Sequence, residues 1–505
     1  MTLSPLPESE PQADAADHAA QRAHRSAPWY WQPLRGSGVP LVEQLALHVE
    51  GLVRSHGLRA GMRLPSVRQL AEDSGVSRDT VVQAYDRLAA QSLIHSRRGA
   101  GFFVSALRKV DALEAPFPAQ GSAPLSRPAD RAIDTPYLVR TMFQQGAAPE
   151  SSGSAGLLPP QWLAPEMLTS AIRSVGRSAG LSLSGYGLPQ GYAPLRQQIA
   201  AHLQAQDVPV HPEHNLLTVA GVTHGLGLIL RLLVRPGDVV LVEDPAWFHM
   251  FGSLQAAGAQ LVGVPRGPDG PDITALAALA AQHRPRLFIV NTAVHNPTGQ
   301  TLSAGVAHAM LKVAEQYDFL LVEDDTYADF HPGRPTRLAA LDRLQRVLLV
   351  GGYSKTLAGG LRVGYIAAQA ERIEQLLDLK LLAGLTSAQL GEMVVHRILS
   401  EGLYRRHVER LRERVDKARA QCLRRVEALG WQVPQEPQAG MFVWADCGMD
   451  SELLARRAAE QGLLLAPGVL FSPRQAPGCM LRLSVPLAQH AAPWELMVRL
   501  QKQLR

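Results

Sequence analysis

The stretch that decides the fold is VLLVGGYSKT (residues 347–356), in which an apolar run ends in two glycines and then a Ser-Lys pair. Two earlier stretches have the same form: LFIVNTAVHNPTG (287–299) and FLLVEDDTY (319–327). Apolar runs of this kind, separated by helical stretches, are typical of buried parallel strands. Ligands of such sheets bind beyond the carboxyl ends of the strands. The sequence therefore predicts an α/β domain whose crevice gathers three polar side chains: Asn296, Asp324 and Lys355.

These three side chains suit pyridoxal phosphate. The Lys355 amine would join the aldehyde of the cofactor, and Asp324 would pair with the protonated pyridine nitrogen and keep the ring an electron sink. Asn296 would bind the phenolic oxygen of the ring, and Tyr327 is placed to do the same. A Ser-Lys pair or an Asn-Pro-Thr-Gly turn alone indicates little, so the prediction depends on their occurring together.

The remaining cofactor contacts are predicted from positions near the other strand ends. Ser354 and Arg362 lie close to Lys355 along the chain and would hold the phosphate. A turn after the strand-like run at 216–219 would add backbone amides at a helix start, where anions bind. Trp247, just after an Asp-Pro pair, is placed to stack on the ring. The turn after residues 216–219 would offer the backbone amides of Val222 and Thr223 to the phosphate.

From about residue 155 to the C-terminus, six motifs occur in an order that resembles a fold type I aminotransferase of the aspartate aminotransferase superfamily. They are YGLPQGYAPLR (186–196), AGVTHGL (220–226), HNPTG (295–299), EDDTYADF (323–330), YSKTLAGGLRVGY (353–365) and MLRLSV (480–485). The resemblance implies a fold type I transferase domain with a mainly parallel central sheet, a small C-terminal α/β subdomain and pyridoxal phosphate as cofactor.

The same resemblance implies two further roles. Arg482 would bind the carboxylate of an amino-acid-like ligand, and Tyr186 would reach the phosphate of the neighbouring subunit's cofactor, so we expect a homodimer. Two positions stay open. His224 is as well explained by a core histidine as by a ligand contact, and Thr326 stands where some related regulators have Tyr, which makes the role of Tyr327 less secure.

A small basic region precedes this domain. Apolar residues between 40 and 53 have the spacing of a helix with one buried face. Ser66, with Gln69 three residues later, predicts a capped second helix, and Ser77 predicts a third. The two are joined by a short turn at Gly75, which is the helix-turn-helix spacing. Apolar residues on either side of the basic, glycine-containing stretch RRGAG (97–101) then predict a β-hairpin. The region is therefore predicted to be a winged helix-turn-helix.

This region resembles the DNA-binding domain of GntR-type regulators through RLPSVRQLA (63–71), GVSRDTVVQAYDRL (75–88) and RRGAGFFV (97–104). The resemblance implies contacts to double-stranded operator DNA from one set of residues: Arg68, Ser77, Arg78, Thr80, Arg98 and Gly99. Val82 stands where some relatives carry a base-reading arginine. The alternative is a winged helix that contacts protein and leaves its arginines solvated.

Composition sets the frame for these domains. The 505 residues are 46% hydrophobic and 19% charged, which fits a globular protein of two or more domains. Ten Lys and Arg against six Asp and Glu fall between residues 38 and 110, although the net charge of the chain is only +5. A small basic domain on a nearly neutral body indicates a polyanion partner for that domain.

We therefore expect a disordered tail at 1–36, the winged helix at 37–106, a proline-containing linker at 107–136 and an effector domain at 137–505. Three cysteines form no disulfide framework, and we see no secretory signal or membrane span, so we expect a cytoplasmic protein without a metal site.

Winged helix, linker and aminotransferase domain together resemble the MocR subfamily of GntR regulators. The resemblance implies a transcription regulator that senses pyridoxal phosphate, or a small amino acid or amine, through its large domain. Two alternatives stay open: a working aminotransferase with an accessory DNA-binding domain, since Lys355, Asp324, Asn296, Arg362 and Arg482 are all retained, and a sensor for the cofactor itself.

Overall fold

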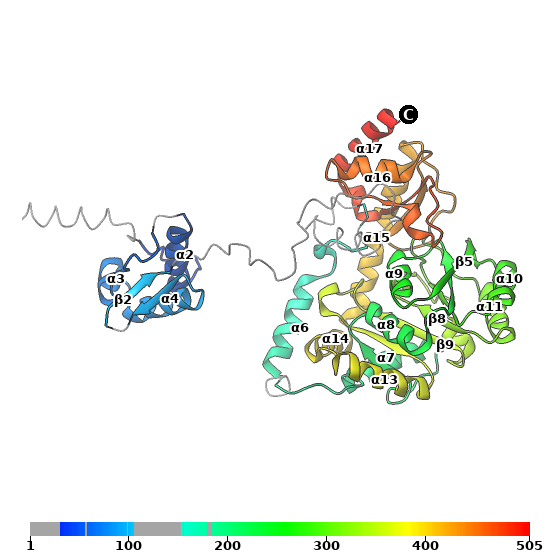
Figure 1. The fold of residues 1–505 in the computed structure, drawn as a ribbon, viewed down its shortest axis with the longest axis horizontal. Helices are drawn as coiled ribbons and strands as arrows, with labels where there is room; N and C mark the ends of the chain where they lie inside the picture. Colours follow the sequence, from blue (N-terminus) through cyan, green and yellow to red (C-terminus); the bar gives the residue numbers. More distant parts are fainter. Residues whose placement is uncertain are drawn as a thin grey trace, which may run out of the picture. The chain divides into compact units, whose positions relative to one another are not determined.

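The computed structural model describes residues 31–55, 58–97, 99–105, 153, 154, 156–178 and 184–504. They form two units, one within residues 1–127 and one within 128–505 (Figure 1), and each is described by itself. Most of the predicted tail and all of the predicted linker at 107–136 lie outside the described residues.

The small unit is a three-helix fold with a two-stranded wing. Strands β1 and β2 pair antiparallel from Ile94 opposite Val104 to Arg97 opposite Gly101. The helices pack around Leu45, Tyr85 and Leu88, none of which is exposed to solvent. Trp31 is also buried in this core. The elements are α2 (Leu41–Arg54), α3 (Val67–Ser74), α4 (Arg78–Ala90), β1 (Ile94–Arg97) and β2 (Gly101–Val104).

The predicted helix caps are present in this unit. The Ser66 hydroxyl accepts from the Gln69 amide at the start of α3, and the Ser77 hydroxyl accepts from the Thr80 amide at the start of α4. The Gln69 side chain donates along the helix to Asp73. Gly75 ends α3 with φ +63°, a left-handed conformation that glycine adopts at little cost, so the chain turns directly into α4.

An eight-stranded, mostly parallel sheet forms the centre of the large unit, in the order β3-β10-β9-β8-β7-β4-β5-β6. Strands β9, β8, β7, β4 and β5 run parallel, whereas β10 is antiparallel to both its neighbours and β6 is antiparallel to β5. The strands are β3 (Leu216–Val219), β4 (Val239–Asp244), β5 (Gln260–Gly267), β6 (Gly270–Pro271), β7 (Leu287–Val290), β8 (Leu320–Asp324), β9 (Val347–Gly352) and β10 (Gly364–Ala367).

Helices cover both faces of this sheet, which is why its strands are apolar throughout. Alternate residues of β7 point to opposite faces: Phe288 and Val290 into one core cluster, Leu287 and Ile289 into another. The first face is covered by α6 (Pro165–Ser178), α7 (Ala193–Gln204), α10 (Ile273–His283), α11 (Ala304–Gln316), α12 (Leu338–Asp342) and α14 (Gln389–Ser400). The second is covered by α8 (Val222–Leu233), α9 (Phe248–Ala256) and α13 (Ala370–Gly384).

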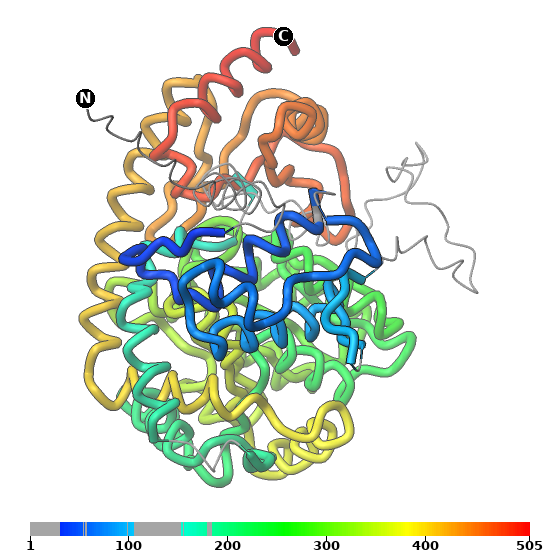
Figure 2. Tube along the Cα trace, turned by 90° about the vertical axis from the view of Figure 1, so that its left-hand side faces the viewer, coloured from blue at the N-terminus to red at the C-terminus, as the bar shows by residue number. Residues whose placement is uncertain are grey.

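The C-terminal subdomain has its own core and a three-stranded antiparallel sheet in the order β11-β13-β12. Helix α15 (Leu403–Ala428) runs from α14 into this subdomain, and Figure 2 shows it along its length. Its residues Leu411, Val415 and Cys422 pack in the subdomain core. The other elements are β11 (Phe442–Asp446), α16 (Ser451–Ala459), β12 (Ala466–Pro467), β13 (Met480–Ser484) and α17 (Ala491–Leu504).

Short 3-10 helices complete the described elements: η2 (Pro160–Trp162), η4 (Ala328–Phe330), η5 (Gly359–Leu361), η6 (Gly468–Phe471) and η7 (Val485–Gln489). No helix of the described segments has the length and apolar character needed to cross a membrane. The predicted fold class, a winged helix-turn-helix with a type I transferase domain, is confirmed.

Candidate functional site

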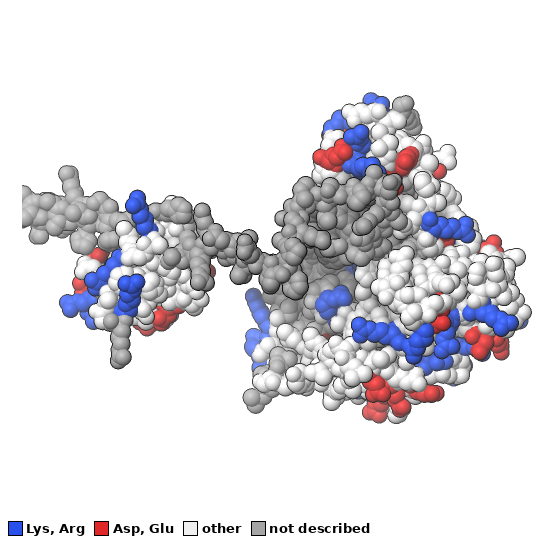
Figure 3. Space-filling view, in the orientation of Figure 1, with Lys and Arg blue, Asp and Glu red and all other residues white. Residues whose placement is uncertain are grey.

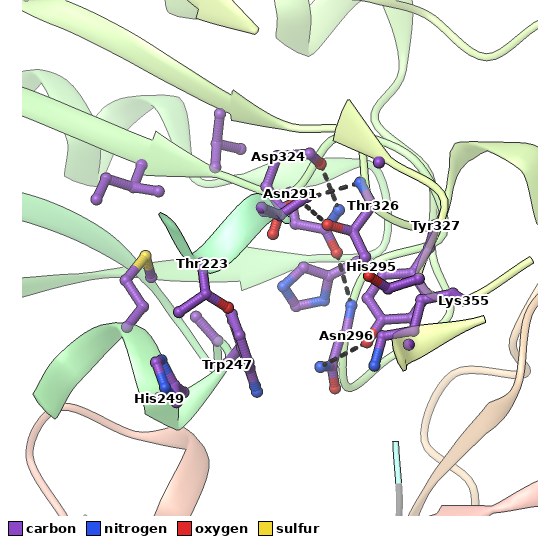
Figure 4. Close-up of a pocket in the computed structure, with 18 of the residues that line it drawn as sticks. Thr223, Trp247, His249, Asn291, His295, Asn296, Asp324, Thr326, Tyr327 and Lys355 are labelled. Atoms are coloured by element: carbon purple, nitrogen blue, oxygen red, sulfur yellow. Dashed lines mark hydrogen bonds between the residues drawn. The ribbon is translucent and has the colours of Figure 1, made fainter. Parts of the chain in front are cut away.

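A cavity of about 590 Å³ opens at the carboxyl ends of the parallel strands of the large unit, where β4, β7, β8 and β9 give way to loops. Figure 4 shows that the side chains drawn there converge from several of these strand ends. Nine of the ten predicted cofactor-binding residues line this cavity: Val222, Thr223, Trp247, Asn296, Asp324, Tyr327, Ser354, Lys355 and Arg362. The common strand polarity therefore gathers residues that are far apart in the sequence.

Lys355 follows β9 and lies on the cavity wall. Its Nζ donates to the carbonyl oxygen of Gly156 at 2.6 Å and lies 6.0 Å from the centre of the Tyr327 ring. Burial, with the positive charges of Arg482 and Arg362, lowers the pKa of Lys355 to about 8, although Asp324 opposes the shift. A lysine that deprotonates near pH 8 supplies the neutral amine that attack on an aldehyde requires.

Asp324 is the last residue of β8, and its carboxylate is held by the turn that follows. Oδ1 accepts from the Thr326 amide at 3.0 Å and from the Thr326 hydroxyl at 2.5 Å. Burial raises the pKa of Asp324 to about 6, against the lowering effect of these two hydrogen bonds. A cationic partner, such as a protonated pyridine nitrogen, would favour the ionised carboxylate.

Asn296 joins the cavity to Arg482. Its Oδ1 accepts from Arg482 Nη1 at 2.9 Å, and its Nδ2 donates to the Tyr327 hydroxyl at 3.5 Å. Arg482 itself is only 2% exposed and lies behind Asn296, with its guanidinium 4.2 Å from the Phe442 ring centre and 4.9 Å from that of Phe471. Its Nε is buried and has no hydrogen-bond partner among the described residues. Arg482 is thus next to the cavity but not on its wall.

A cradle for an anion forms where α8 begins. Gly221 precedes the helix with φ +83°, and a Cβ at this position would lie 2.7 Å from Arg362 Nη2. Arg362 donates to the Ala220 carbonyl at 2.8 Å, which fixes its guanidinium beside the helix start. Exposed amides at a helix N-terminus and a neighbouring guanidinium together favour a phosphate.

His224 has a structural role at this helix start. Its Nδ1 accepts from the Ala220 amide at 3.0 Å, and burial lowers the pKa of the imidazole, with contributions from Lys380, Arg231 and Arg362. His224 is therefore a neutral histidine that holds the turn, which answers the question that the sequence left open between a core histidine and a ligand contact.

Trp247 precedes α9 and has one face covered. The ring of His249 lies parallel to the indole, with centroids 4.9 Å apart and planes 14° from each other. Burial lowers the pKa of His249, so this ring is neutral at pH 7. His249 also lines the cavity, and the sequence prediction missed it although it lies two residues beyond Trp247.

Asn291 is a second residue that the sequence prediction missed. It follows β7 and connects the two neighbouring strand ends. Its Nδ2 donates to the Asp324 carbonyl at 2.7 Å, and its Oδ1 accepts from the Asn296 amide at 2.8 Å (Figure 4). Its own amide donates to Glu243 at 2.8 Å. The available signal was its position, since it ends an apolar run as Asp324 does.

A buried group of three side chains contacts Asn291 through Glu243. Glu243 pairs with Arg266, and His295 Nε2 lies 3.4 Å from the same carboxylate. Burial raises the pKa of Glu243, but Arg266 and His295 outweigh it and the net shift is downward. Burial and Arg266 lower the pKa of His295 to about 4. Glu243 is thus ionised at neutral pH and His295 is neutral.

Tyr186 is the predicted cofactor residue that does not reach this cavity. Its side chain is 83% exposed, on the segment that leads to α7.

Three of the predicted DNA contacts, Ser77, Arg78 and Thr80, lie at the start of α4. Arg78 and Ser77 are exposed, and the Ser77 hydroxyl lies 2.8 Å from that of Thr80. Arg68 is exposed and forms an ion pair with Glu72 at 2.9 Å. Gly99 is at the exposed tip of the wing with φ +75°, whereas Arg98 lies outside the described residues. Figure 3 shows several Lys and Arg side chains on one face of this unit.

Comparison with known proteins agrees with both halves of this description. Residues 154–492 match the model of the class I and II aminotransferases, and residues 41–104 match that of the bacterial regulatory proteins of the gntR family. The chain belongs to the class I and II aminotransferase family, whose fold and members are pyridoxal-phosphate-dependent. More particularly, it is of the MocR type, in which a GntR-type DNA-binding domain precedes an aminotransferase-like domain.

Three similar proteins illustrate the likeness to regulators and to aminotransferases. The probable rhizopine catabolism regulatory protein MocR of Rhizobium meliloti is 29% identical over 451 residues, 86% of this chain and 87% of that protein. The 2-aminoadipate transaminase of Thermus thermophilus is 32% identical over 360 residues, 68% of this chain and 88% of that protein. The structure of LysN, the α-aminoadipate aminotransferase of Thermus thermophilus in complex with N-(5'-phosphopyridoxyl)-L-leucine, matches 72% of this chain and 94% of its own with TM-score 0.66 and 27% identity.

Proposed function

We propose that this protein is a transcription regulator that binds operator DNA through its small unit and responds to pyridoxal phosphate, an amino compound, or both, through its large unit. The observation that carries the proposal is the presence in one chain of a capped recognition helix with exposed Arg78 and a cavity that holds Lys355 beside Asp324. A GntR-type domain implies DNA binding, and an aminotransferase-like domain implies a small-molecule ligand.

The residues of the cavity fit the cofactor in separate ways. Lys355 would present its amine to the aldehyde, Asp324 would pair with the ring nitrogen, and Asn296 and Tyr327 would bind the phenolic oxygen; all four line the cavity. Arg362, Ser354 and the amides of Val222 and Thr223 would hold the phosphate, while Trp247 would stack on the ring. When bound, the cofactor supplies an aldehyde that joins amines and a ring that accepts electrons.

We infer that the effector carries an amino group and a carboxylate. An amine is needed to take the place of Lys355 on the cofactor. Arg482, a planar guanidinium suited to a carboxylate, lies directly behind Asn296. A ligand regulates only if it binds the two conformations of the protein with different affinity.

Catalytic transamination is the second candidate function. It is favoured by the retention of Lys355, Asp324 and Arg482 around one cavity, and by the 32% identity with a transaminase. Steady-state turnover with pairs of amino and keto acids tests it: a regulator that keeps its ligand gives slow or no turnover. If pyridoxal phosphate alone switches DNA binding and no amino acid changes the spectrum, the protein senses the cofactor itself.

We also propose that the protein acts as a homodimer and that it works in the cytoplasm, the compartment of its operator DNA. Tyr186 is 83% exposed and does not line the cavity that contains Lys355 of its own chain, as expected if it completes the site of a partner. A two-fold dimer presents two winged helices, so the operator should contain paired half-sites. The domain boundaries 37–106 and 137–505 belong to this proposal, with the segment between them as the linker.

Lys355→Ala tests the proposed cofactor site. We expect the visible absorbance of lysine-bound cofactor to disappear while the far-ultraviolet circular dichroism stays unchanged. Lys380→Met is the matched control, because Lys380 is also buried but donates to the Pro189 and Thr218 carbonyls elsewhere in the unit. This control should keep the absorbance band. A band that survives in Lys355→Ala would show that another lysine holds the cofactor.

A further inference from the structure

A short segment of chain at the start of the large unit lies against the site. It comprises residues 153, 154 and 156–158, and we call it the strap. Along the chain it follows directly on residues 106–152, which connect it to the winged-helix unit and lie outside the described residues. The strap is therefore the first described part of the large unit along the chain, and it lies against the ligand site.

The strap gives one backbone carbonyl to each of two cations of the site. Lys355 Nζ donates to the Gly156 oxygen at 2.6 Å, and Arg482 Nη2 donates to the Ser154 oxygen at 2.5 Å. Both are charge-assisted hydrogen bonds, which are stronger than bonds between neutral groups. The two cations are the same groups that the proposed amino-acid ligand must engage.

A ligand cannot reach Arg482 unless a group that covers it moves. The guanidinium is 2% exposed, and four groups of the described residues contact it: the rings of Phe442 and Phe471, the side chain of Asn296 and the carbonyl of Ser154. Both phenylalanines are buried core residues, and Asn296 is held through its backbone amide by Asn291. Of these four contacts, the Ser154 carbonyl is the one that we expect a ligand to displace. A carboxylate is a stronger acceptor than a carbonyl, so it can displace this bond.

The amine of Lys355 responds to the cofactor and not to the carboxylate of the ligand. As an ammonium it has three N–H donors, one of which is given to Gly156. Joining the cofactor would take donors away from this nitrogen, and a ligand amine that replaces Lys355 on the cofactor would return them. The bond that an amino-acid ligand weakens is therefore the one between Arg482 and the Ser154 carbonyl.

Both ends of the strap are anchored in the large unit. At its C-terminal end Leu158 is buried in the subdomain core, and Trp162 follows in the same core. At its N-terminal end Gly153 and Ser154 are buried, the Ser154 amide donates to the Leu464 carbonyl at 3.0 Å, and the Ser484 amide donates to the Gly153 carbonyl at 2.9 Å. The bond from Arg482 to Ser154 adds to this N-terminal anchor, so its loss should raise exchange at the Ser154 and Ser484 amides.

We propose that the strap is a ligand-released anchor: an amino-acid-type ligand whose carboxylate binds Arg482 frees the Ser154 carbonyl and loosens the strap, from which the chain leads back to the DNA-binding unit. The inference rests on the proposed function, because it takes the effector to be such a ligand. It adds the contact that senses the ligand and the direction in which the signal leaves the site.

Hydrogen exchange of the full-length protein with bound pyridoxal phosphate tests this directly. The readout is the exchange rate of the peptide that contains residues 153–158, together with the Ser484 amide. The probes are the twenty L-amino acids, each added at saturation, with the visible spectrum recorded in parallel. For a probe that changes the spectrum, we expect strap exchange to rise about tenfold, because the charge-assisted bond between Arg482 and the Ser154 carbonyl is lost. A spectral change with unchanged strap exchange would overturn the proposal.

Two variants decide the matter without any ligand. Arg482→Met and Lys355→Ala each remove one donor to the strap, so strap exchange should rise several-fold in both. Lys380→Met removes a buried lysine that donates to carbonyls outside the strap, and it should leave strap exchange unchanged. If Arg482→Met does not fold, Lys355→Ala alone decides. Strap protection equal to wild type in the folded variants would overturn the anchor.

The outcomes also separate the strap from the proposed function. If no amino acid changes the spectrum, the amino-acid effector is wrong, but the two variants still test the strap. If an amino acid binds and the strap stays protected, the effector stands and the ligand-released anchor fails.

Discussion

Lys355 sits in surroundings that disfavour its charged form. Burial and two neighbouring arginines lower its pKa to about 8, and only Asp324 acts in the opposite direction. Below pH 8 the amine is mostly an ammonium, and above pH 8 it is mostly neutral. Because only the neutral amine attacks an aldehyde, the protein should take up the cofactor readily at a pH where an ordinary lysine would not.

The first prediction concerns this pH dependence. The rate at which the cofactor-free protein captures pyridoxal phosphate should rise through a midpoint near pH 8 and level off above it, as measured by stopped-flow absorbance. In Arg482→Met one positive neighbour is lost, the pKa of Lys355 rises, and the midpoint should move to higher pH. A wild-type midpoint at or above about pH 10, the value of an unperturbed lysine, would contradict the prediction.

A second residue-scale prediction concerns Asn291. Asn291→Ala leaves the Asp324 carbonyl and the Asn296 amide without this partner, so the free energy of unfolding should fall by about 1–3 kcal/mol. Since Asp324 and Asn296 are the proposed contacts of the cofactor, the dissociation constant for pyridoxal phosphate should rise about tenfold, measured by absorbance titration.

Asn215→Ala is the matched control for Asn291→Ala. The Asn215 side chain also accepts from a backbone amide and donates to a backbone carbonyl, those of His211 and Ala368, but it does not line the cavity. It should lose comparable stability and keep the cofactor affinity. Equal cofactor binding in the two variants would show that Asn291 does not position the site.

At the scale of elements, helix α4 is arranged to present its first turn. Ser77 caps the helix, which fixes the N-terminus, and Val81, Ala84, Tyr85 and Leu88 bury the opposite face. Arg78 begins the helix and is exposed, so its guanidinium is available to a base edge or a phosphate. Val82 is 40% exposed on the same helix, where it offers an apolar contact in place of a charge.

The third prediction uses two arginines of this helix. Arg78→Ala should weaken operator binding by about 1–3 kcal/mol if Arg78 reads a base bidentately. If it binds only a phosphate, the slope of log K against log salt should fall by about 0.9. Arg87→Ala is the control: nine residues along a helix places Arg87 on the opposite face, where it pairs with Glu43 at 3.8 Å. Fluorescence anisotropy that finds Arg78→Ala as tight as wild type would refute the assignment.

At the scale of the whole molecule, several large apolar side chains of the large unit form a surface that is exposed among the described residues. It is formed by two chain segments that meet where Gly187 lies against Gln389. Its exposed members are Tyr186 at 83%, Leu188 at 59%, Leu382 at 86%, Leu385 at 49% and Leu390 at 44%. Large exposed apolar groups that gather in this way mark an interaction surface, and the exposure of Tyr186 agrees with a second copy of the chain as the partner.

The fourth prediction tests this surface as the dimer interface. Leu382→Arg places a charge where the partner is expected, so the dimer dissociation constant should rise at least about a hundredfold in sedimentation experiments. Cofactor affinity should fall with it, because Tyr186 of the partner would be lost. Leu341→Arg, at a leucine that is 52% exposed on α12, should leave the dimer intact. A wild-type protein that is monomeric with cofactor bound would refute the interface.

Much of the molecule was determined by local sequence. Caps such as Ser66 and Ser77, the apolar runs of β7, β8 and β9, and the polar residues that follow them are all patterns within a few residues, so they could be recognised without the fold. Parallel strands then bring their ends to one edge, and this single rule placed Asn296, Asp324 and Lys355 around one cavity.

The tertiary structure alone decided the contacts that surround those residues. Gly156 and Lys355 are 199 residues apart, and Ser154 and Arg482 are 328 apart, yet each pair shares a hydrogen bond. In both cases the acceptor is a backbone carbonyl, which every residue has, so no residue type in the sequence marks it. The placement of Arg482 behind Asn296 depends in the same way on how the C-terminal subdomain packs. Side-chain identity carried the chemistry of the site, whereas packing at long range chose which backbone groups hold it.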